Sequence, residues 1–411
     1  MGMLTYRAAN ECFGELALSQ YAVMRRIVAF IQPTLAIGLA VALSRRVAAR
    51  RFDDDSNSES SYLLAALILI LASTTAVVVP LILFPQKFAF AFFGSMDYRP
   101  HVLAIAPMLV GMGLHVVCYA QLHGRFSMRS ANLLQLLNIG LIPFIAIICA
   151  SSLPEAFFWT GSLIALVSIS GIALQIRNVR CAIQGILPAC VQLLRLGPPR
   201  VPGDIALALL MVTPATIVTH YCGVMEGGLV AFCVTLLTLA QTTTTPISTL
   251  LLPQATALLR SGNVGKLRRQ VLAILTVSLV ITAPAIVVFW LATDFFLTIC
   301  LGKYAAELPT LAQIIILGAL PLNGYTCLRS VVDAGRDRAV NARSCCLSLV
   351  CFFIVMPFVR TISSDIYFAP ISFVIALFCL AGFTSWETWQ LLGTKSESAE
   401  PVRLSVLEKA A

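Results

Sequence analysis

Charged residues are scarce in this sequence. Only 11% of its 411 residues are Asp, Glu, Lys or Arg, 59% are hydrophobic, and the mean hydropathy is +0.90. Soluble domains carry roughly 25% charged residues, so this composition excludes a soluble two-domain protein. We therefore expect an integral membrane protein.

The motifs of nucleotide hydrolysis and metal chemistry are also missing. The chain has no GxxxxGK[ST] phosphate loop, no HExxH, no GxSxG and no CxxC, and its four histidines are scattered. The acidic run Asp53–Asp55 offers oxygen ligands for Mg²⁺, but a solvated charge run opposite the arginines before it is the favoured interpretation. We predict no enzyme activity, no cofactor and no metal site.

Long apolar runs fill most of the chain. About 20 apolar residues span the ~30 Å hydrocarbon core of a bilayer, and the sequence predicts an all-α polytopic protein. The eleven predicted spans lie near 16–44, 61–84, 102–122, 132–150, 158–176, 202–220, 229–252, 271–291, 310–331, 344–362 and 367–390.

The basic residues gather on one side of these spans. Of the 28 Lys and Arg residues, 20 fall in one set of alternate loops and the C-terminus, five fall in the other set, and three lie inside spans. Basic loops stay in the cytoplasm, so we expect cytoplasmic loops, a cytoplasmic C-terminus, an outward N-terminus and no nucleic-acid partner. The predicted cytoplasmic loops are 45–60, 123–131, 177–201, 253–270 and 332–343.

Residues 195–201 form a hinge rich in Pro and Gly between two bundles. Proline has no amide donor, and Pro202 suits the first turn of a new helix. We expect an N-terminal bundle at 1–194, a cytoplasmic hinge at 195–201, a C-terminal bundle at 202–392 and a cytoplasmic tail at 393–411.

The two bundles repeat each other weakly. A shift of roughly 210 residues matches turns in the same order: Gly14 with Gly227, Pro33 with Pro246, Gly94 with Gly302, and Gly124 with Gly335. Loops of equal charge predict the same orientation, and thus a pseudo-twofold axis along the membrane normal.

The repeat also predicts a missing helix. Pro202 begins a helix 25 residues before Gly227, so its first-half counterpart begins upstream of Met1. The residues before Gly14 are too few to span a bilayer. We therefore expect 11 visible transmembrane helices of a 12-helix design.

Polar residues inside spans mark the candidate site, because an Arg at mid-bilayer costs at least ~2.5–3.5 kcal/mol. Arg25 and Arg26 lie in the first span. In the aligned span, spacings of three, four and three place four threonines on one helical face. We predict facing walls of a wet cavity from Arg25, Arg26, Gln32, Thr238, Gln241, Thr242 and Thr245, with Thr235 on the same face.

A structural alternative stays open for each of these residues. Threonine hydroxyls satisfy themselves on carbonyls of their own helix, and arginines snorkel to the interface. Asp204 and Arg329 are weaker candidates. Asp204 offsets the dipole of a helix start, and Arg329 lies four residues before Asp333, where a local ion pair is favoured.

Three segments carry a resemblance to a known family: LRLGPPRVPGDIALALL, GGLVAFCVTLLTLAQTTTTPISTLLLPQATALLR and CFGELALSQYAVMRRIVAFIQPTLAIGLAVALSRRVAAR. They resemble Wzx-type polysaccharide flippases of the multidrug/oligosaccharidyl-lipid/polysaccharide exporter superfamily. The resemblance implies two six-helix bundles around a central cavity, alternating access, and a polyprenyl-diphosphate-linked oligosaccharide as substrate. It also implies that Arg25 and Arg26 meet the diphosphate, that the protein lies in the bacterial cytoplasmic (inner) membrane, and that membrane lipids, a polysaccharide polymerase and a chain-length regulator are partners.

Three other functions remain open. A cation-coupled exporter of drugs or small molecules from the same superfamily needs acidic cation sites, and no Asp or Glu lies deep in a predicted span. A membrane glycosyltransferase or polymerase-associated protein needs a large outer loop, and the outer loops here are short. The third is a non-transporting partner in a membrane assembly.

Overall fold

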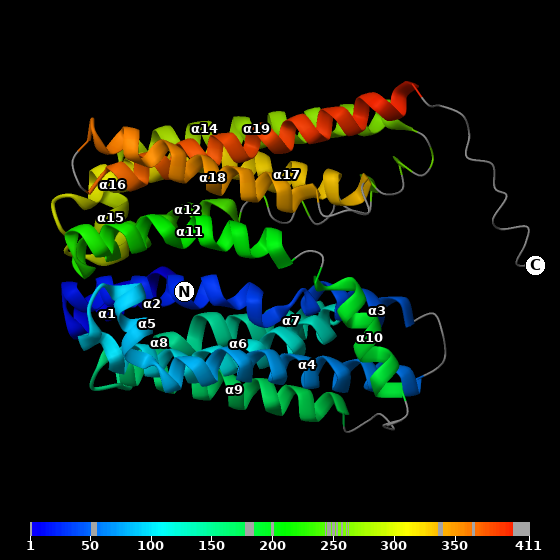
Figure 1. Ribbon diagram of the computed structural model, residues 1–411, viewed down its shortest axis with the longest axis horizontal. Coiled ribbons are helices and arrows are strands. Elements are labelled where there is room, and N and C mark those ends of the chain that lie inside the picture. The colour runs from blue at the N-terminus through cyan, green and yellow to red at the C-terminus, as the bar shows by residue number, and fades with distance from the viewer. Residues whose placement is uncertain are drawn as a thin grey trace, which may run out of the picture.

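The computed structural model describes residues 2–50, 56–176, 185–198, 201–242, 244, 248, 251, 254–255, 258–259, 261, 263–335, 340–363 and 366–397. Within these residues every regular element is a helix, and the helices form two lobes that lie side by side (Figure 1). Ten of the described helices are long and apolar enough to cross a membrane, or up to eleven if one bent pair counts as a span. The predicted all-α architecture of two bundles is confirmed.

The first lobe, the N-lobe, holds the helices up to the hinge. They are α1 (Gly2–Phe13), α2 (Glu15–Ala36), α3 (Leu39–Arg50), α4 (Ser56–Leu83), α5 (Pro85–Phe93), η1 (Met96–Tyr98), α6 (Arg99–Gly124), α7 (Met128–Gln135), η2 (Leu136–Leu141), α8 (Ile142–Cys149), α9 (Leu153–Ile176) and α10 (Ile186–Leu196).

The second lobe, the C-lobe, holds the helices that follow. They are α11 (Val201–Cys222), α12 (Val224–Gln241), α14 (Val264–Leu291), α15 (Thr293–Leu301), α16 (Leu308–Ile316), α17 (Ala319–Gly335), α18 (Val340–Arg360) and α19 (Phe368–Glu397). Helix α19 continues five residues past the predicted start of the tail, and residues 398–411 lie outside the described part of the chain.

The lobes repeat each other in a register that differs from the predicted one. Gly14 (φ 87°, ψ 177°) and Gly223 (φ 116°, ψ 172°) both precede a helix with nearly the same backbone angles. Such positive φ values favour glycine. Gly14 therefore pairs with Gly223, 209 residues on, and not with Gly227, which lies inside α12. The predicted pair of Gly94 and Gly302 holds, because each ends a nine-residue helix with φ near +75°.

Helix α1 corrects the expectation that the residues before Gly14 form only an outward segment. In the register of 209 residues, these twelve residues match the last twelve of α11. The packing repeats too: α1 contacts α15 and α8, as α11 contacts α5 and α18. Tyr6 and Ala9 of α1 are fully buried. The segment therefore belongs to the core of the bundle.

The first predicted span, 16–44, is two helices rather than one. Helices α2 and α3 meet at a bend of 50°. Pro33 removes a hydrogen bond from the last turn of α2, and Ile37 and Gly38 then take φ values of 45° and 68°. The bend turns α3 away from the axis of α2.

The predicted span 229–252 is also different. Helix α12 begins five residues earlier and ends at Gln241. Thr242 and Thr244 donate their hydroxyls to the carbonyls of Leu239 and Gln241, an alternative to helical bonding that threonine offers the backbone. The run of threonines before Pro246 thus ends the regular helix.

The sequence gave no expectation of α10, which falls in the predicted loop 177–201. One face of this helix, Ala189 and Leu193, is buried, while Leu187 is 75% exposed. Its end packs against the bend described above, since a Cβ on Gly38 would lie 2.5 Å from the carbonyl oxygen of Gly197. The hinge is therefore anchored on the N-lobe.

The lobes join at one end of the molecule only. We call the end that holds Gly14, Gly94, Gly223 and Gly302 the glycine end, and the end that holds Arg45, Arg125, Arg195 and Lys266 the basic end. One apolar core runs through both lobes from the glycine end. Toward the basic end each lobe has a core of its own, around Leu43 in one and Leu267 in the other.

Candidate functional site

A cavity of about 410 Å³ lies between the lobes where their cores separate. Its walls come from α2 and α3 on one side and from α11 and α12 on the other, with Val116 of α6. Most of the lining is apolar. The polar side chains in the lining are Arg26, Gln32, Asp204, Thr238 and Gln241.

Arg26 binds the opposite lobe. Its side chain is 8% exposed. Nη2 donates to Thr235 Oγ1 at 2.6 Å and to Thr238 Oγ1 at 3.4 Å, and Nε donates to the carbonyl oxygen of Ala231 at 3.3 Å. All three acceptors are neutral, and the structure shows no ion pair of Arg26 among the residues it describes. This guanidinium therefore carries an uncompensated charge at the edge of the cavity.

The contact between Arg26 and Thr235 lies close to the repeat axis. The two residues are 209 apart and so occupy equivalent positions of α2 and α12. A second equivalent pair, Ser19 and Gly228, touches two turns earlier, where a Cβ on Gly228 would lie 2.2 Å from the Ser19 Cα. Helices α2 and α12 thus cross at these two pairs.

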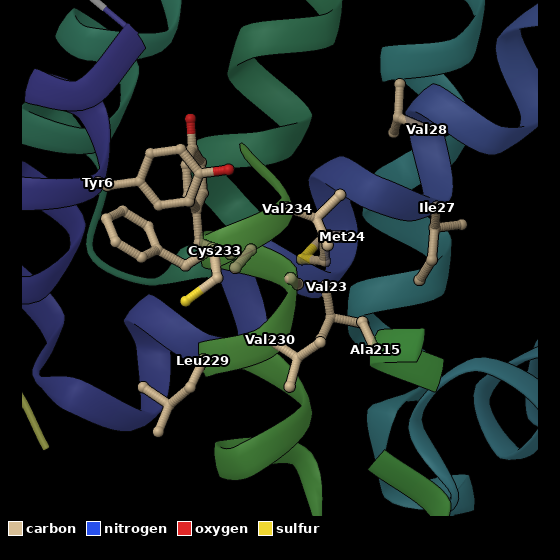
Figure 2. Packing of buried hydrophobic residues seen from close by; sticks show 14 of the residues in the cluster. Tyr6, Val23, Met24, Ile27, Val28, Ala215, Leu229, Val230, Cys233 and Val234 are labelled. Atoms are coloured by element: carbon tan, nitrogen blue, oxygen red, sulfur yellow. The ribbon is translucent and has the colours of Figure 1, made fainter. Parts of the chain in front are cut away.

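Apolar side chains surround this crossing. Figure 2 shows Val23 and Met24 of α2 together with Val230 and Val234 of α12, and Tyr6 of α1 beside them. Arg26 therefore passes from a dry contact at the glycine end to the cavity that faces the basic end.

Arg25 faces a different space. It lines a cavity of about 90 Å³ inside the N-lobe, between α2, α6, α9 and the η2–α8 segment. Nη1 donates to Tyr21 Oη at 3.3 Å, and the guanidinium carbon lies 5.8 Å and 5.9 Å from the ring centres of Tyr6 and Tyr21. Adjacent arginines thus serve two cavities, because neighbouring helix positions point about 100° apart.

Tyr6 connects the two arginines. Its ring lies under the Arg25 guanidinium, and its hydroxyl is 3.0 Å from Thr235 Oγ1, the same atom that accepts from Arg26. A short polar path therefore joins the N-lobe cavity to the cavity between the lobes.

The other predicted site residues are dispersed. Gln32 lines both cavities. Gln241 lines the cavity between the lobes and donates to Thr326 Oγ1 at 2.7 Å. Thr242 is exposed and donates to the carbonyl of Leu239. Thr245 lies outside the described residues.

The threonine stripe shows both predicted behaviours. Thr235 and Thr238 donate their hydroxyls to carbonyls of α12, as the structural alternative expects. Their oxygens also accept from Arg26. The hydroxyl hydrogens are therefore occupied, and these side chains meet a donor rather than offer one.

Asp204 and Arg329 pair with each other across the C-lobe. Arg329 Nη2 donates to Asp204 Oδ1 at 2.7 Å, and Nε lies 3.7 Å from Asp333 Oδ2. Asp204 also lines the cavity between the lobes. The dipole and local-pair interpretations each omitted this contact between α11 and α17.

Sequence reasoning missed Tyr6, Asn138 and the Ser19–Gly228 contact. Tyr6 precedes the first predicted span, and Asn138 is a lone polar residue in an apolar run. The only available signal was the repeat, which in the register of 209 places Gly228 opposite Ser19. No group of three His, Cys, Asp or Glu residues that suits a metal ion occurs in the described part of the chain.

Comparisons with known proteins agree on the fold. No protein-family model matches the sequence, and no curated protein matches it. An inward-facing conformation of a multidrug resistance MATE family transporter of the MOP superfamily matches with a TM-score of 0.79 at 13% identity, over 97% of this chain and 94% of that one. An outward-facing conformation of such a transporter gives 0.70 at 16% identity, over 97% and 94%. The eukaryotic MATE transporter AtDTX14 gives 0.67 at 10% identity, over 96% and 93%. This chain is therefore a multi-pass membrane protein with the two-lobed fold of MATE family transporters.

Proposed function

We propose that this protein transports a lipid-linked anion by alternating access, and that the anion is an oligosaccharide on a polyprenyl diphosphate. The observation that carries the proposal is Arg26, a nearly buried guanidinium that reaches the cavity between the lobes with only neutral acceptors. A buried charge without a partner is costly, so function rather than stability explains its place. A diphosphate supplies the missing negative charge.

Binding at Arg26 offers a physical route to the conformational change. The guanidinium now holds α12 through Ala231, Thr235 and Thr238. Phosphate oxygens form stronger, charge-assisted and bidentate bonds with arginine than neutral hydroxyls do. A bound diphosphate therefore draws Arg26 off α12 and weakens the contact that keeps the lobes together at the glycine end.

The orientation belongs to the same proposal. We place the basic end in the cytoplasm, since basic loops are retained there. The cavity between the lobes then lies on the cytoplasmic side of the contact between Ser19 and Gly228. The higher TM-score against the inward-facing transporter than against the outward-facing one supports this state. The proposed location is the bacterial inner membrane, beside a polysaccharide polymerase and a chain-length regulator.

A second candidate function is export of drugs or other small molecules. The matching solved structures include multidrug resistance transporters, and Asp204 gives the cavity a carboxylate that a cationic substrate can meet. Asp204 is already paired with Arg329 at 2.7 Å. A cation must therefore displace an arginine, whereas an anion at Arg26 displaces only neutral groups.

Reconstitution into vesicles tests the choice between these functions. The substrates are a fluorescent oligosaccharide on a short polyprenyl diphosphate and a cationic dye. We expect protein-dependent movement of the first across the bilayer, with rates that fall when the diphosphate is replaced by a neutral linkage. Movement of the dye alone would reject the lipid-linked substrate and favour the exporter.

Topology is tested by labelling single cysteines in a Cys-free background. Lys266→Cys lies at the basic end and Asp97→Cys at the glycine end, and both positions are exposed. We expect an impermeant maleimide added to whole cells to label position 97 and not position 266, because the basic loops stay in the cytoplasm. Labelling of 266 from outside would invert the proposed orientation.

A further inference from the structure

We propose that the N-lobe cavity is a second binding site, which takes a small inorganic anion of about the size of chloride at Arg25. The lining residues are Tyr21, Arg25, Val28, Ala29, Gln32, Met108, Met112, Asn138, Ile139, Pro143, Phe157 and Thr160. The proposal concerns binding within one lobe, so it stands apart from the transported substrate.

The first argument is charge. No Asp or Glu occurs among the residues that line this cavity. The guanidinium of Arg25 has one hydrogen bond, to Tyr21, and otherwise meets the rings of Tyr6 and Tyr21. Ring faces attract a cation but do not neutralise it. A full positive charge within an apolar lobe therefore requires an anion that the described side chains do not provide.

The second argument is size. The cavity measures about 90 Å³. A water molecule takes up about 30 Å³ of liquid, and an engineered cavity of about 150 Å³ accepts benzene. The N-lobe cavity therefore holds an ion with one or two waters and excludes a sugar or a diphosphate. Its apolar walls, which include Met108, Pro143 and Phe157, suit a weakly hydrated anion.

The third argument is an unsatisfied amide. Asn138 is fully buried. Its Nδ2 lies 3.0 Å from His115 Nδ1 and 3.2 Å from Ser168 Oγ, while its Oδ1 has no hydrogen-bond partner. The two amide orientations differ only by a half-turn. After that turn Oδ1 accepts from the Ser168 hydroxyl and from a His115 N–H, and Nδ2 becomes a donor for the anion.

The site is also placed to influence the cavity between the lobes. Tyr6 stacks on Arg25 and touches Thr235, the acceptor of Arg26. An anion that draws Arg25 into the N-lobe cavity removes the cation from the face of Tyr6. We therefore expect occupancy of this site to change the strength of the contact between Tyr6 and Thr235.

The test uses the full chain, purified in detergent, with sodium chloride or sodium bromide titrated against sodium gluconate at constant ionic strength. A ligand that binds only the folded state raises the unfolding temperature saturably. We expect a saturable rise of several degrees in the wild type, its loss in Arg25→Gln, and its retention in Arg26→Gln, which removes the same charge from the other cavity. A wild type without saturable halide dependence would overturn the proposal, as would an equal response in Arg25→Gln.

A second variant covers the case in which Arg25→Gln does not fold. Thr160→Glu places a carboxylate in the lining of the same cavity. We expect it to pair with Arg25, to raise stability in gluconate and to abolish the response to halide. Crystals of the wild type grown in bromide should show anomalous scattering beside Arg25. A Thr160→Glu protein that still responds fully to halide, with no bromide at Arg25, would place the ion elsewhere.

Discussion

Transport of the lipid-linked anion falls about 10- to 100-fold in Arg26→Gln, while the protein stays folded in the membrane. Hydrogen bonds to charged groups contribute about 1.5–3 kcal/mol, and each 1.4 kcal/mol is a factor of ten. Glutamine keeps an amide donor for Thr235 but loses the charge that meets the diphosphate. Folding is spared because the variant also removes an uncompensated charge from a nearly buried position.

The measurement is the initial rate of movement of the fluorescent substrate in vesicles, normalised to the amount of folded protein. Arg7→Gln is the matched control, since it removes one positive charge at an exposed ion pair with Glu11. Arg26→Lys should recover part of the rate, because an ammonium keeps the charge but lacks the bidentate fork. Full transport by Arg26→Gln would show that this side chain only joins the lobes.

The sequence was sufficient for the architecture because its signals extend over whole segments. Apolar runs and the alternation of basic loops each depend on dozens of residues, so errors of a few positions do not matter. The same reasoning placed Arg25 and Arg26 among the candidates, because any arginine in an apolar span is unusual. It could not assign each arginine to a cavity.

That assignment depended on the register of the repeat. The predicted register of 213 residues pairs Arg25 with Thr238, whereas Gly14 and Gly223 set a register of 209 and pair Arg26 with Thr235. The difference of four residues is close to one helical turn. Such an error preserves the polar face and exchanges the residues on it. Backbone angles resolve the register, and they are not visible in the sequence.

Short elements were lost for a different reason. Helix α1 has 12 residues and α10 has 11, so neither is long enough to register as a span. Both are stabilised by contacts with other elements: Tyr6 with Thr235, and Gly197 with Gly38. Tertiary packing, rather than local propensity, supplies most of the stability of helices this short.

The other large effect is expected from Gly228→Val, which should separate the lobes at the glycine end. A Cβ at this position lies 2.2 Å from the Ser19 Cα, a backbone atom of the other lobe. Overpacking of this kind costs about 1–3 kcal/mol or more, and a penalty confined to one conformer changes the ratio of the two states by about 10- to 100-fold. We expect transport to fall because the state with the lobes joined at this end becomes rare.

Distances between spin labels at Asp97→Cys and Glu307→Cys measure this shift, since both positions are exposed and lie at the glycine end of different lobes. Gly161→Val is the control. Its Cβ would lie 2.2 Å from the Met108 nitrogen within the N-lobe, so it should reduce the yield of folded protein without separating the labels in the fraction that folds. The contrast follows from where each clash lies: two rigid lobes can move apart, but α6 and α9 within one lobe cannot. An unchanged distance distribution in Gly228→Val, with full transport, would mean that the Ser19 contact does not control the transport cycle.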